Sequence, residues 1–136
     1  MSVGIHVGTS VFELGAASFF NSFFSTVCNV LEHGQWGTRF PTTMRVLYSG
    51  TVPAEALPSL ADELAAIRLE LAGFPPSAVV WNIDDSSEQP PWGNQIAPTI
   101  TTLAEYWVTS RGRDIFSELV AAIDLATANH KALAIE

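Results

Sequence analysis

The feature that most constrains the fold is a strongly apolar stretch at residues 18–33, Ser-Phe-Phe-Asn-Ser-Phe-Phe-Ser-Thr-Val-Cys-Asn-Val-Leu-Glu-His. Its phenylalanines, together with Val27 and Leu31, recur at helical spacing. A helix that is apolar over so much of its circumference has to be buried on more than one side, against a sheet and other elements. The stretch therefore predicts a core helix that Ser18 caps at its start and Gly34 ends.

The rest of the chain predicts further helices and strands around this core helix. Apolar residues at intervals of three and four indicate helices over residues 40–48, 58–72 and 111–129, the last one capped by Ser110. Runs of β-prone residues indicate strands over residues 3–7, 11–14, 78–83, 103–109 and 132–135, with a helix as the alternative for 103–109. We therefore expect a single α+β domain over residues 1–136, with one mixed or antiparallel sheet of about five strands and about four helices packed mainly on one face.

The chain is acidic, with a net charge of −8 from 14 acidic and 6 basic residues. This balance argues against nucleic acid and anionic membranes as partners, because binding to phosphate groups requires lysine and arginine. Residues 49–110 hold eight acidic residues against Arg68, which leaves seven of the eight net charges in that part. If these carboxylates share a face, their field attracts a basic partner protein, although solubility alone would also explain the charge.

The cysteine content and the hydropathy indicate a cytoplasmic protein. Cys28 is the single cysteine, so the chain forms no intramolecular disulfide, as is typical of a reducing compartment. We expect Cys28 to fill the core. The sequence shows neither a signal-peptide pattern nor an apolar run of about 18 residues. Because charged residues make up 15 % of the chain, part of the surface must be neutral or apolar, and a partner or a second copy in a homodimer would cover it.

The sequence contains no recognisable catalytic or metal-binding motif. His6, His33 and His130 lack the spacing of metal ligands, and Lys131, the single lysine, belongs to no phosphate-binding loop. A dyad of Cys28 with a histidine has weak support. We therefore expect a protein that is not an enzyme and that holds no cofactor and no metal.

A long polar loop over residues 84–98 is the strongest candidate for a binding surface. It begins with Asp84, Asp85 and Glu88 and continues through two prolines to Trp92 and Asn94. The prolines hold the backbone extended, which would present Trp92 as a rigid anchor; alternatively, Trp92 folds back to plug the core. The carboxylates either contact a partner or hold a cation, or they solvate the loop. The candidate partner-binding residues are Asp84, Asp85, Glu88, Trp92 and Asn94.

Two arginines near the start of the last predicted helix form a second candidate site. Arg111 and Arg113 flank Gly112, so they could grip an anion together with the helix N-terminus. The alternative is that each arginine pairs with a nearby carboxylate of this acidic chain.

Several short motifs are distributed along nearly the whole chain. They are Val-Gly-Ile-His-Val-Gly at 3–8, the phenylalanine run at 18–26, Trp-Gly at 36–37, Phe-Pro at 40–41, Trp-Asn-Ile-Asp-Asp at 81–85, Gln-Pro-Pro-Trp-Gly-Asn at 89–94 and Tyr-Trp-Val-Thr-Ser-Arg-Gly-Arg-Asp at 106–114. Together these motifs resemble the bacterial immunity protein 70 family. The resemblance implies a non-catalytic α+β protein of the cytoplasm that binds a cognate toxin domain of a polymorphic toxin system and blocks it. A basic nuclease is our hypothesis for the toxin, because the chain is acidic.

Two other classes of function stay open on the sequence alone. One is a small enzyme or ligand-binding domain that uses the acidic 84–94 loop with Arg111 and Arg113. The other is an accessory protein that works as a homo-oligomer. A pocket that brings Asp84, His6 and Arg113 together would favour the first of these.

Overall fold

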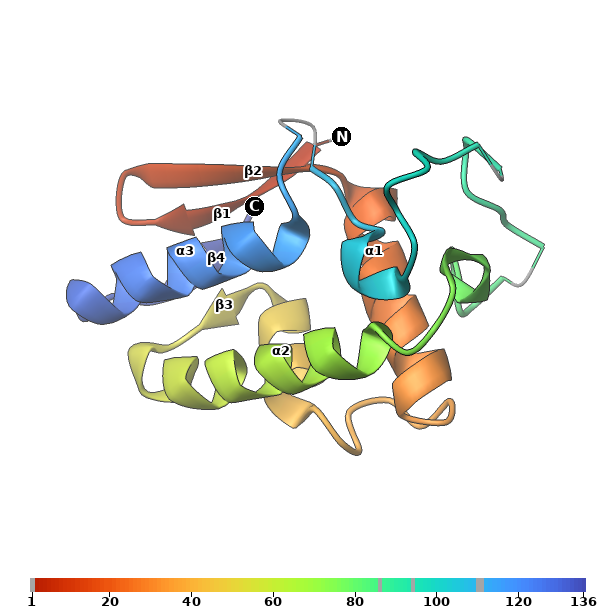
Figure 1. Ribbon diagram of the computed structural model, residues 1–136. Coiled ribbons are helices and arrows are strands. Elements are labelled where there is room, and N and C mark those ends of the chain that lie inside the picture. Colours follow the sequence, from red (N-terminus) through yellow and green to blue (C-terminus); the bar gives the residue numbers. More distant parts are fainter. Residues whose placement is uncertain (1, 86, 94, 110–111) are drawn as a thin grey trace.

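One antiparallel sheet forms one layer of the fold (Figure 1). The computed structural model describes residues 2–85, 87–93, 95–109 and 112–136. Within these residues the sheet order is β2-β1-β4-β3, and every pair is antiparallel. The α+β class and the single sheet are confirmed, with four strands in place of about five. The strands are β1 (Ser2–Val7), β2 (Ser10–Ala16), β3 (Thr51–Val52) and β4 (Leu133–Ile135).

The β1–β2 hairpin is the one that residues 3–7 and 11–14 predict. Gly8 lies in its turn with a φ of 59°, a conformation that favours glycine. Ile5 stands opposite Phe12 in the register and is fully buried. Val11 stands opposite His6, on the other face of the hairpin, and is 51 % exposed. One face of the hairpin therefore packs on the core, and Val11 marks the open face.

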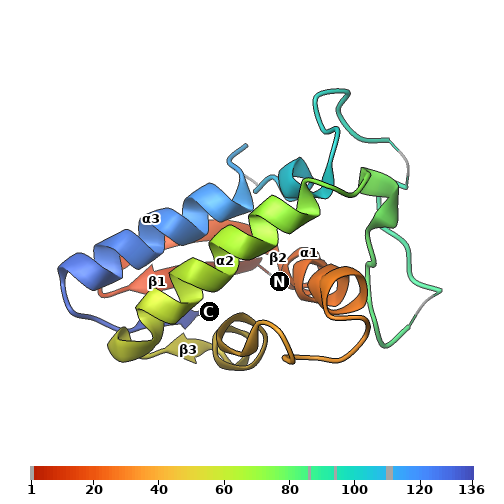
Figure 2. The same ribbon diagram turned by 60° about the horizontal axis from the view of Figure 1, so that its bottom comes forward.

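Helices cover the buried face of the sheet. α1 (Ala17–Thr26) follows β2 directly and continues as a π-helical segment, η1 (Val27–Leu31). α3 (Ile115–Ala128) packs against β1, β2 and β4, and α2 (Leu57–Leu71) packs against α3. Figures 1 and 2 show α2 and α3 side by side in front of the sheet, with α1 across one end. The remaining helical pieces are the π-helical η2 (Thr42–Leu47) and the 3₁₀ turns η3 (Ala54–Ala56), η4 (Pro76–Ala78) and η5 (Leu103–Glu105).

The phenylalanine-rich stretch forms the centre of the core, as predicted. Phe23 is fully buried, and its ring meets those of Trp107 and Phe116 edge-on at centroid distances of 5.3 and 5.5 Å. Such edge-to-face pairs add to the stabilisation from burial. Cys28 is buried in the same core, as predicted.

The predicted strand at 78–83 is wrong because hydroxyl groups of α1 take up its backbone hydrogen bonds. Thr26 Oγ1 accepts from Val80 N at 2.9 Å and donates to Val80 O at 3.2 Å. Ser25 Oγ accepts from Ile83 N at 3.1 Å. The segment is thus extended and bound to a helix, and it joins no sheet.

The predicted strand at 103–109 is also wrong, since its first residues form η5. Thr102 caps this turn by accepting from Ala104 N at 3.2 Å, and Glu105 completes a capping box. Val108 makes an isolated bridge to Asp114, which is all that remains of a strand there. The sequence analysis also missed β3, which has two residues and hence no periodicity to detect.

Two predicted helix caps are wrong as well. α1 begins at Ala17, and its cap position, Ala16, makes no side-chain hydrogen bond, so Ser18 lies inside the helix. α3 begins at Ile115, where Asp114 Oδ1 accepts from Phe116 N at 3.1 Å. Asp114 therefore takes the role predicted for Ser110, a residue outside the described ranges.

Candidate partner-binding surface

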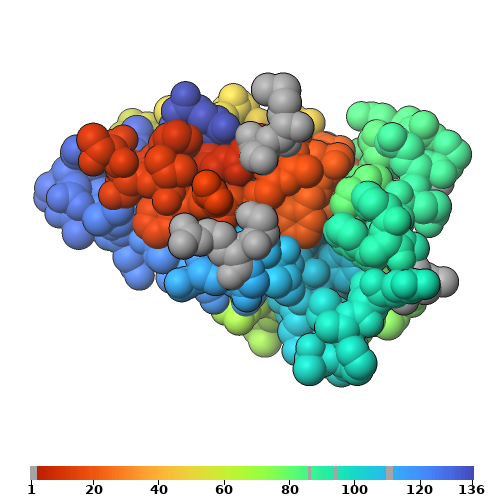
Figure 3. Space-filling view, turned by 90° about the horizontal axis from the view of Figure 1, so that it is seen from above, coloured from red at the N-terminus to blue at the C-terminus, as the bar shows by residue number. Residues whose placement is uncertain are grey.

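The acidic loop projects at one end of the molecule, where Figure 3 shows it in green and teal. Asp84, Asp85 and Glu88 are all exposed. Asn82 Oδ1 accepts from Asp84 N at 3.0 Å, and Asp85 Oδ1 accepts from the hydroxyl and the backbone N of Ser87. The two hydrogen bonds from Ser87 lower the pKa of Asp85, so its carboxylate stays ionised. The loop thus holds three solvent-facing negative charges on short, locally bonded turns.

Trp92 combines features of the two roles that the sequence leaves open, an exposed anchor and a plug of the core. Its ring packs edge-on against Trp81 at a centroid distance of 5.3 Å and lies near Phe19 at 6.4 Å. Its Nε1 donates to the hydroxyl of Tyr106 at 2.9 Å, a group whose pKa is raised by burial. Yet 37 % of Trp92 remains exposed. The side chain is therefore held by other aromatic residues and still presents part of its surface to solvent, on the same loop as the carboxylates.

Ser22 of α1 stabilises the aromatic residues around Trp92 through a hydrogen bond with Trp107. Trp107 is fully buried, and its Nε1 donates to Ser22 Oγ at 2.9 Å. Its ring contacts Tyr106 at a centroid distance of 5.2 Å, and Tyr106 in turn holds Trp92. The sequence analysis did not identify this support. The available signal was the set of hydroxyls at helical spacing among the phenylalanines, Ser22, Ser25 and Thr26, all fully buried.

Arg113 pairs with a carboxylate, as the second of the two interpretations supposed. Its Nε lies 2.5 Å from Oε1 of Glu118, a residue of α3 that is 5 % exposed. Asn94 and Arg111 lie outside the described residues. His6 has Glu136 as its nearest acidic partner, with Nδ1 and Oε2 4.0 Å apart. Each of Arg113 and His6 thus faces a carboxylate other than Asp84.

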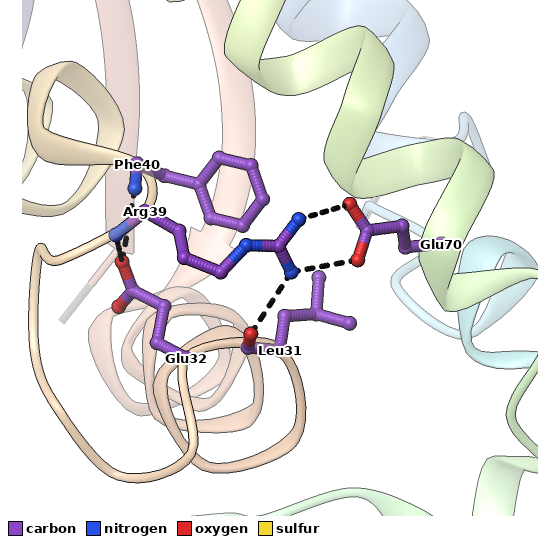
Figure 4. A network of polar contacts seen from close by, with 5 residues as sticks. All are labelled: Leu31, Glu32, Arg39, Phe40 and Glu70. Carbon is purple, nitrogen blue, oxygen red and sulfur yellow. Dashed lines mark hydrogen bonds and ion pairs between the residues drawn. The ribbon is translucent and has the colours of Figure 1, made fainter.

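A second polar network fixes the segment after η1 (Figure 4). Glu32 is 2 % exposed, and its carboxylate accepts from the backbone N of Gly37, Arg39 and Phe40, each at 3.0 Å. The Arg39 guanidinium donates two bonds of 2.7 Å to the Glu70 carboxylate on α2. One buried carboxylate and one arginine therefore fasten this loop between α1 and α2. No pattern in the sequence predicted this network.

Acidification should remove the contribution of Glu70 to stability. Hydrogen bonding to Arg39 lowers the pKa of Glu70 in the folded state. Such a carboxyl stabilises the fold above its unfolded pKa of about 4.3 and loses that contribution as the pH falls through the folded pKa. In urea unfolding, the free-energy gap between wild type and Glu70→Gln should be largest above about pH 5 and shrink below about pH 4. A gap that does not change with pH would contradict this account.

The remaining features of the described residues give little support for a catalytic or metal-binding site. A hollow of about 610 Å³ beside the loop is lined by neutral residues, among them Pro76, Gln89, Ile96 and Tyr106. Burial raises the pKa of the Cys28 thiol, which keeps it protonated and unreactive. Among the residues that the structure describes, no group of three His, Cys, Asp or Glu side chains is placed to hold a metal ion. None of the described helices is long and apolar enough to cross a membrane.

Comparison with known proteins gives one informative result. Neither the curated proteins nor the solved structures contain a match to the chain. The family model described as Immunity protein 70 matches residues 5–135, which is nearly the whole chain. The match includes every residue of the acidic loop, the aromatic cluster around Trp92 and the Glu32 network. The chain therefore belongs to the Immunity protein 70 family.

Proposed function

We propose that this protein binds a cognate bacterial toxin domain and neutralises it by occluding its surface, without catalysis. The family match over residues 5–135 is the observation that carries this proposal. The described residues are consistent with a binding role, because they combine a packed scaffold with an exposed loop that carries both carboxylates and a fixed aromatic ring. Residues 1–136 act as one domain in this proposal, and the site of action is the cytoplasm of a bacterium with a polymorphic toxin system.

The charge distribution supports a basic toxin domain, such as a nuclease, as the partner. Asp84, Asp85 and Glu88 are exposed together at one end of a chain whose net charge is −8. A field of this kind steers a basic partner and raises the association rate. In this proposal Trp92 is the aromatic anchor of the same loop, and Asn94, two positions later in the sequence, is a further contact residue. A tight-binding toxin with a neutral or acidic surface would contradict this part of the proposal.

Co-expression tests the proposed function directly. A candidate toxin domain, taken from a gene found next to this one, is expressed in bacteria with and without this protein. The protein should restore growth, and a purified inactive mutant of the toxin should bind it tightly. Continued growth arrest in the presence of folded, abundant protein would contradict the proposal.

Neutralising the acidic loop should weaken toxin binding mainly through the association rate. The variant Asp84→Asn, Asp85→Asn, Glu88→Gln preserves shape and keeps acceptor oxygens in the turns while removing three charges. We expect the association rate at low salt to fall on the order of tenfold and to depend less on salt. Surface plasmon resonance over a salt series measures both quantities.

A second triple variant controls for total charge. Glu13→Gln, Glu55→Gln, Glu136→Gln removes three exposed charges from other parts of the chain. It should change the association rate much less than the loop variant does. Equal effects of the two variants would show that net charge matters and that the acidic loop is not a contact surface.

A further inference from the structure

The outer surface of the two long helices carries an apolar groove that the fold does not use. α2 and α3 lie side by side in Figures 1 and 2, and a groove of about 440 Å³ runs along them. Its lining includes the small side chains of Ala61 and Ala65 on α2 and the large apolar side chains of Leu69, Phe116 and Val120. The groove therefore has the mainly apolar lining on which an amphipathic helix docks.

Two large apolar side chains of this groove are unusually exposed. Leu69 is 77 % exposed and Val120 is 45 % exposed, although both belong to well-formed helices. Removing a side chain of this kind from water favours binding of a partner. Single exposed apolar residues need no explanation, but two that share one apolar groove are typical of an interaction surface.

The charges around the groove indicate what kind of partner fits. Asp62 lies on the same side of α2 as Leu69, two turns earlier, and Asp124 lies one turn after Val120 on α3; both are exposed. The exposed Glu105 follows Ala104, which also lines the groove.

One cation lines the described part of the groove, and it is already paired. Arg68 NH2 lies 2.9 Å from Asp114 Oδ2, and the guanidinium lies 5.7 Å from the ring centre of Phe116. Because this pair cancels its own charge, the surroundings of the groove are net acidic.

We propose that the α2–α3 groove docks an amphipathic helix of the cognate toxin. The apolar face of that helix covers Leu69 and Val120, and lysines or arginines beside that face meet Asp62, Asp124 and Glu105. A second copy of this chain is a poorer fit, because it would bring acidic rims of like charge together. This inference rests on the proposed function and adds to the acidic loop a second, apolar contact surface.

The test places a carboxylate in the groove and a matched one elsewhere. Leu69→Glu should fold normally because the side chain is largely exposed, and circular dichroism verifies this. Val11→Glu is the control, because it converts an exposed apolar residue on the open face of the β1–β2 hairpin. Binding of the inactivated toxin domain that this protein neutralises in the co-expression test is measured by surface plasmon resonance, and oligomeric state by light scattering.

We expect Leu69→Glu to weaken toxin binding about thirtyfold or more and to abolish rescue of growth, whereas Val11→Glu changes binding by less than about threefold. Wild-type binding by Leu69→Glu overturns the groove inference and leaves the proposed function intact. A wild-type dimer that Leu69→Glu dissociates without loss of toxin binding also overturns it, since the occupant is then a second copy. Failure of the wild-type protein to bind the toxin overturns the proposed function itself.

Discussion

Replacing Glu32 with alanine should lower the free energy of unfolding by about 3 kcal/mol or more. The Glu32 carboxylate accepts hydrogen bonds from the backbone N of Gly37, Arg39 and Phe40, and the side chain is 2 % exposed. Alanine removes the acceptor of all three N–H groups; the hydrogen bonds of Gly37 and Phe40 are buried and that of Arg39 is partly buried. An unsatisfied buried donor costs about 1–3 kcal/mol, so the loss of two buried bonds and a partly buried one outweighs most single substitutions.

Glutamine at the same position separates hydrogen bonding from packing. Oε2 of Glu32 accepts from Arg39 and Phe40, and Oε1 accepts from Gly37. The amide of Glu32→Gln keeps one acceptor oxygen. It can therefore accept either from Gly37 or from Arg39 and Phe40, but not from all three. Urea unfolding should therefore rank stability as wild type, then Glu32→Gln, then Glu32→Ala. Equal stability of wild type and Glu32→Ala would show that the network does not hold the loop.

Trp107→Ala should be the second strongly destabilising substitution, with a loss of about 3–5 kcal/mol. Trp107 is fully buried, and its ring contacts Phe23 and Tyr106 at centroid distances of 5.3 and 5.2 Å. Alanine leaves a large cavity that the surrounding elements cannot fill. Since small domains are stable by about 5–15 kcal/mol in total, we expect a measurable fraction of this variant to be unfolded at 37 °C.

Trp107→Phe serves as the control for this loss. Phenylalanine keeps an aromatic ring but leaves Ser22 Oγ without the bond from Trp107 Nε1, which is 2.9 Å long. We expect its destabilisation to be clearly smaller than that of Trp107→Ala in thermal and urea unfolding. If the two variants unfold alike, the hydrogen bond to Ser22, and not the ring packing, supplies the stabilisation.

The parts of the fold that the sequence predicted are those with a local periodic signal. Apolar residues at helical spacing placed α2 within a residue of its ends and identified the core helix that contains Phe23. Alternation identified the β1–β2 hairpin. In each case the pattern and the element that it produces lie in the same short stretch of chain, so neighbours in the sequence were enough.

The wrong predictions concern segments whose structure depends on distant residues. Residues 78–83 have high β propensity, but their backbone bonds go to Thr26 and Ser25 on α1, more than fifty residues earlier. β3 is too short to show a pattern and exists because β4 pairs with it. Tertiary contacts thus overrode or replaced local propensity in both cases.

The candidate site also has a part that the sequence predicted and a part that depends on residues further away in the chain. Asp84, Asp85 and Glu88 are close in sequence, so their common exposure followed from the loop itself. The fixation of Trp92 by Trp81 and Tyr106 depends on contacts across the chain and had no sequence signature. The groove between α2 and α3 was equally invisible, because it arises from the packing of two helices. The binding role of these residues remains our proposal.

Titration of the toxin with this protein tests the central claim most directly. The claim is that the protein works by covering the toxin surface and transforms nothing. Toxin activity should fall linearly and reach zero at one molecule of this protein per toxin domain, and the toxin should keep its intact mass and regain activity after separation. Complete inactivation at a small fraction of that ratio, with a changed toxin mass, would contradict the account and identify an enzyme.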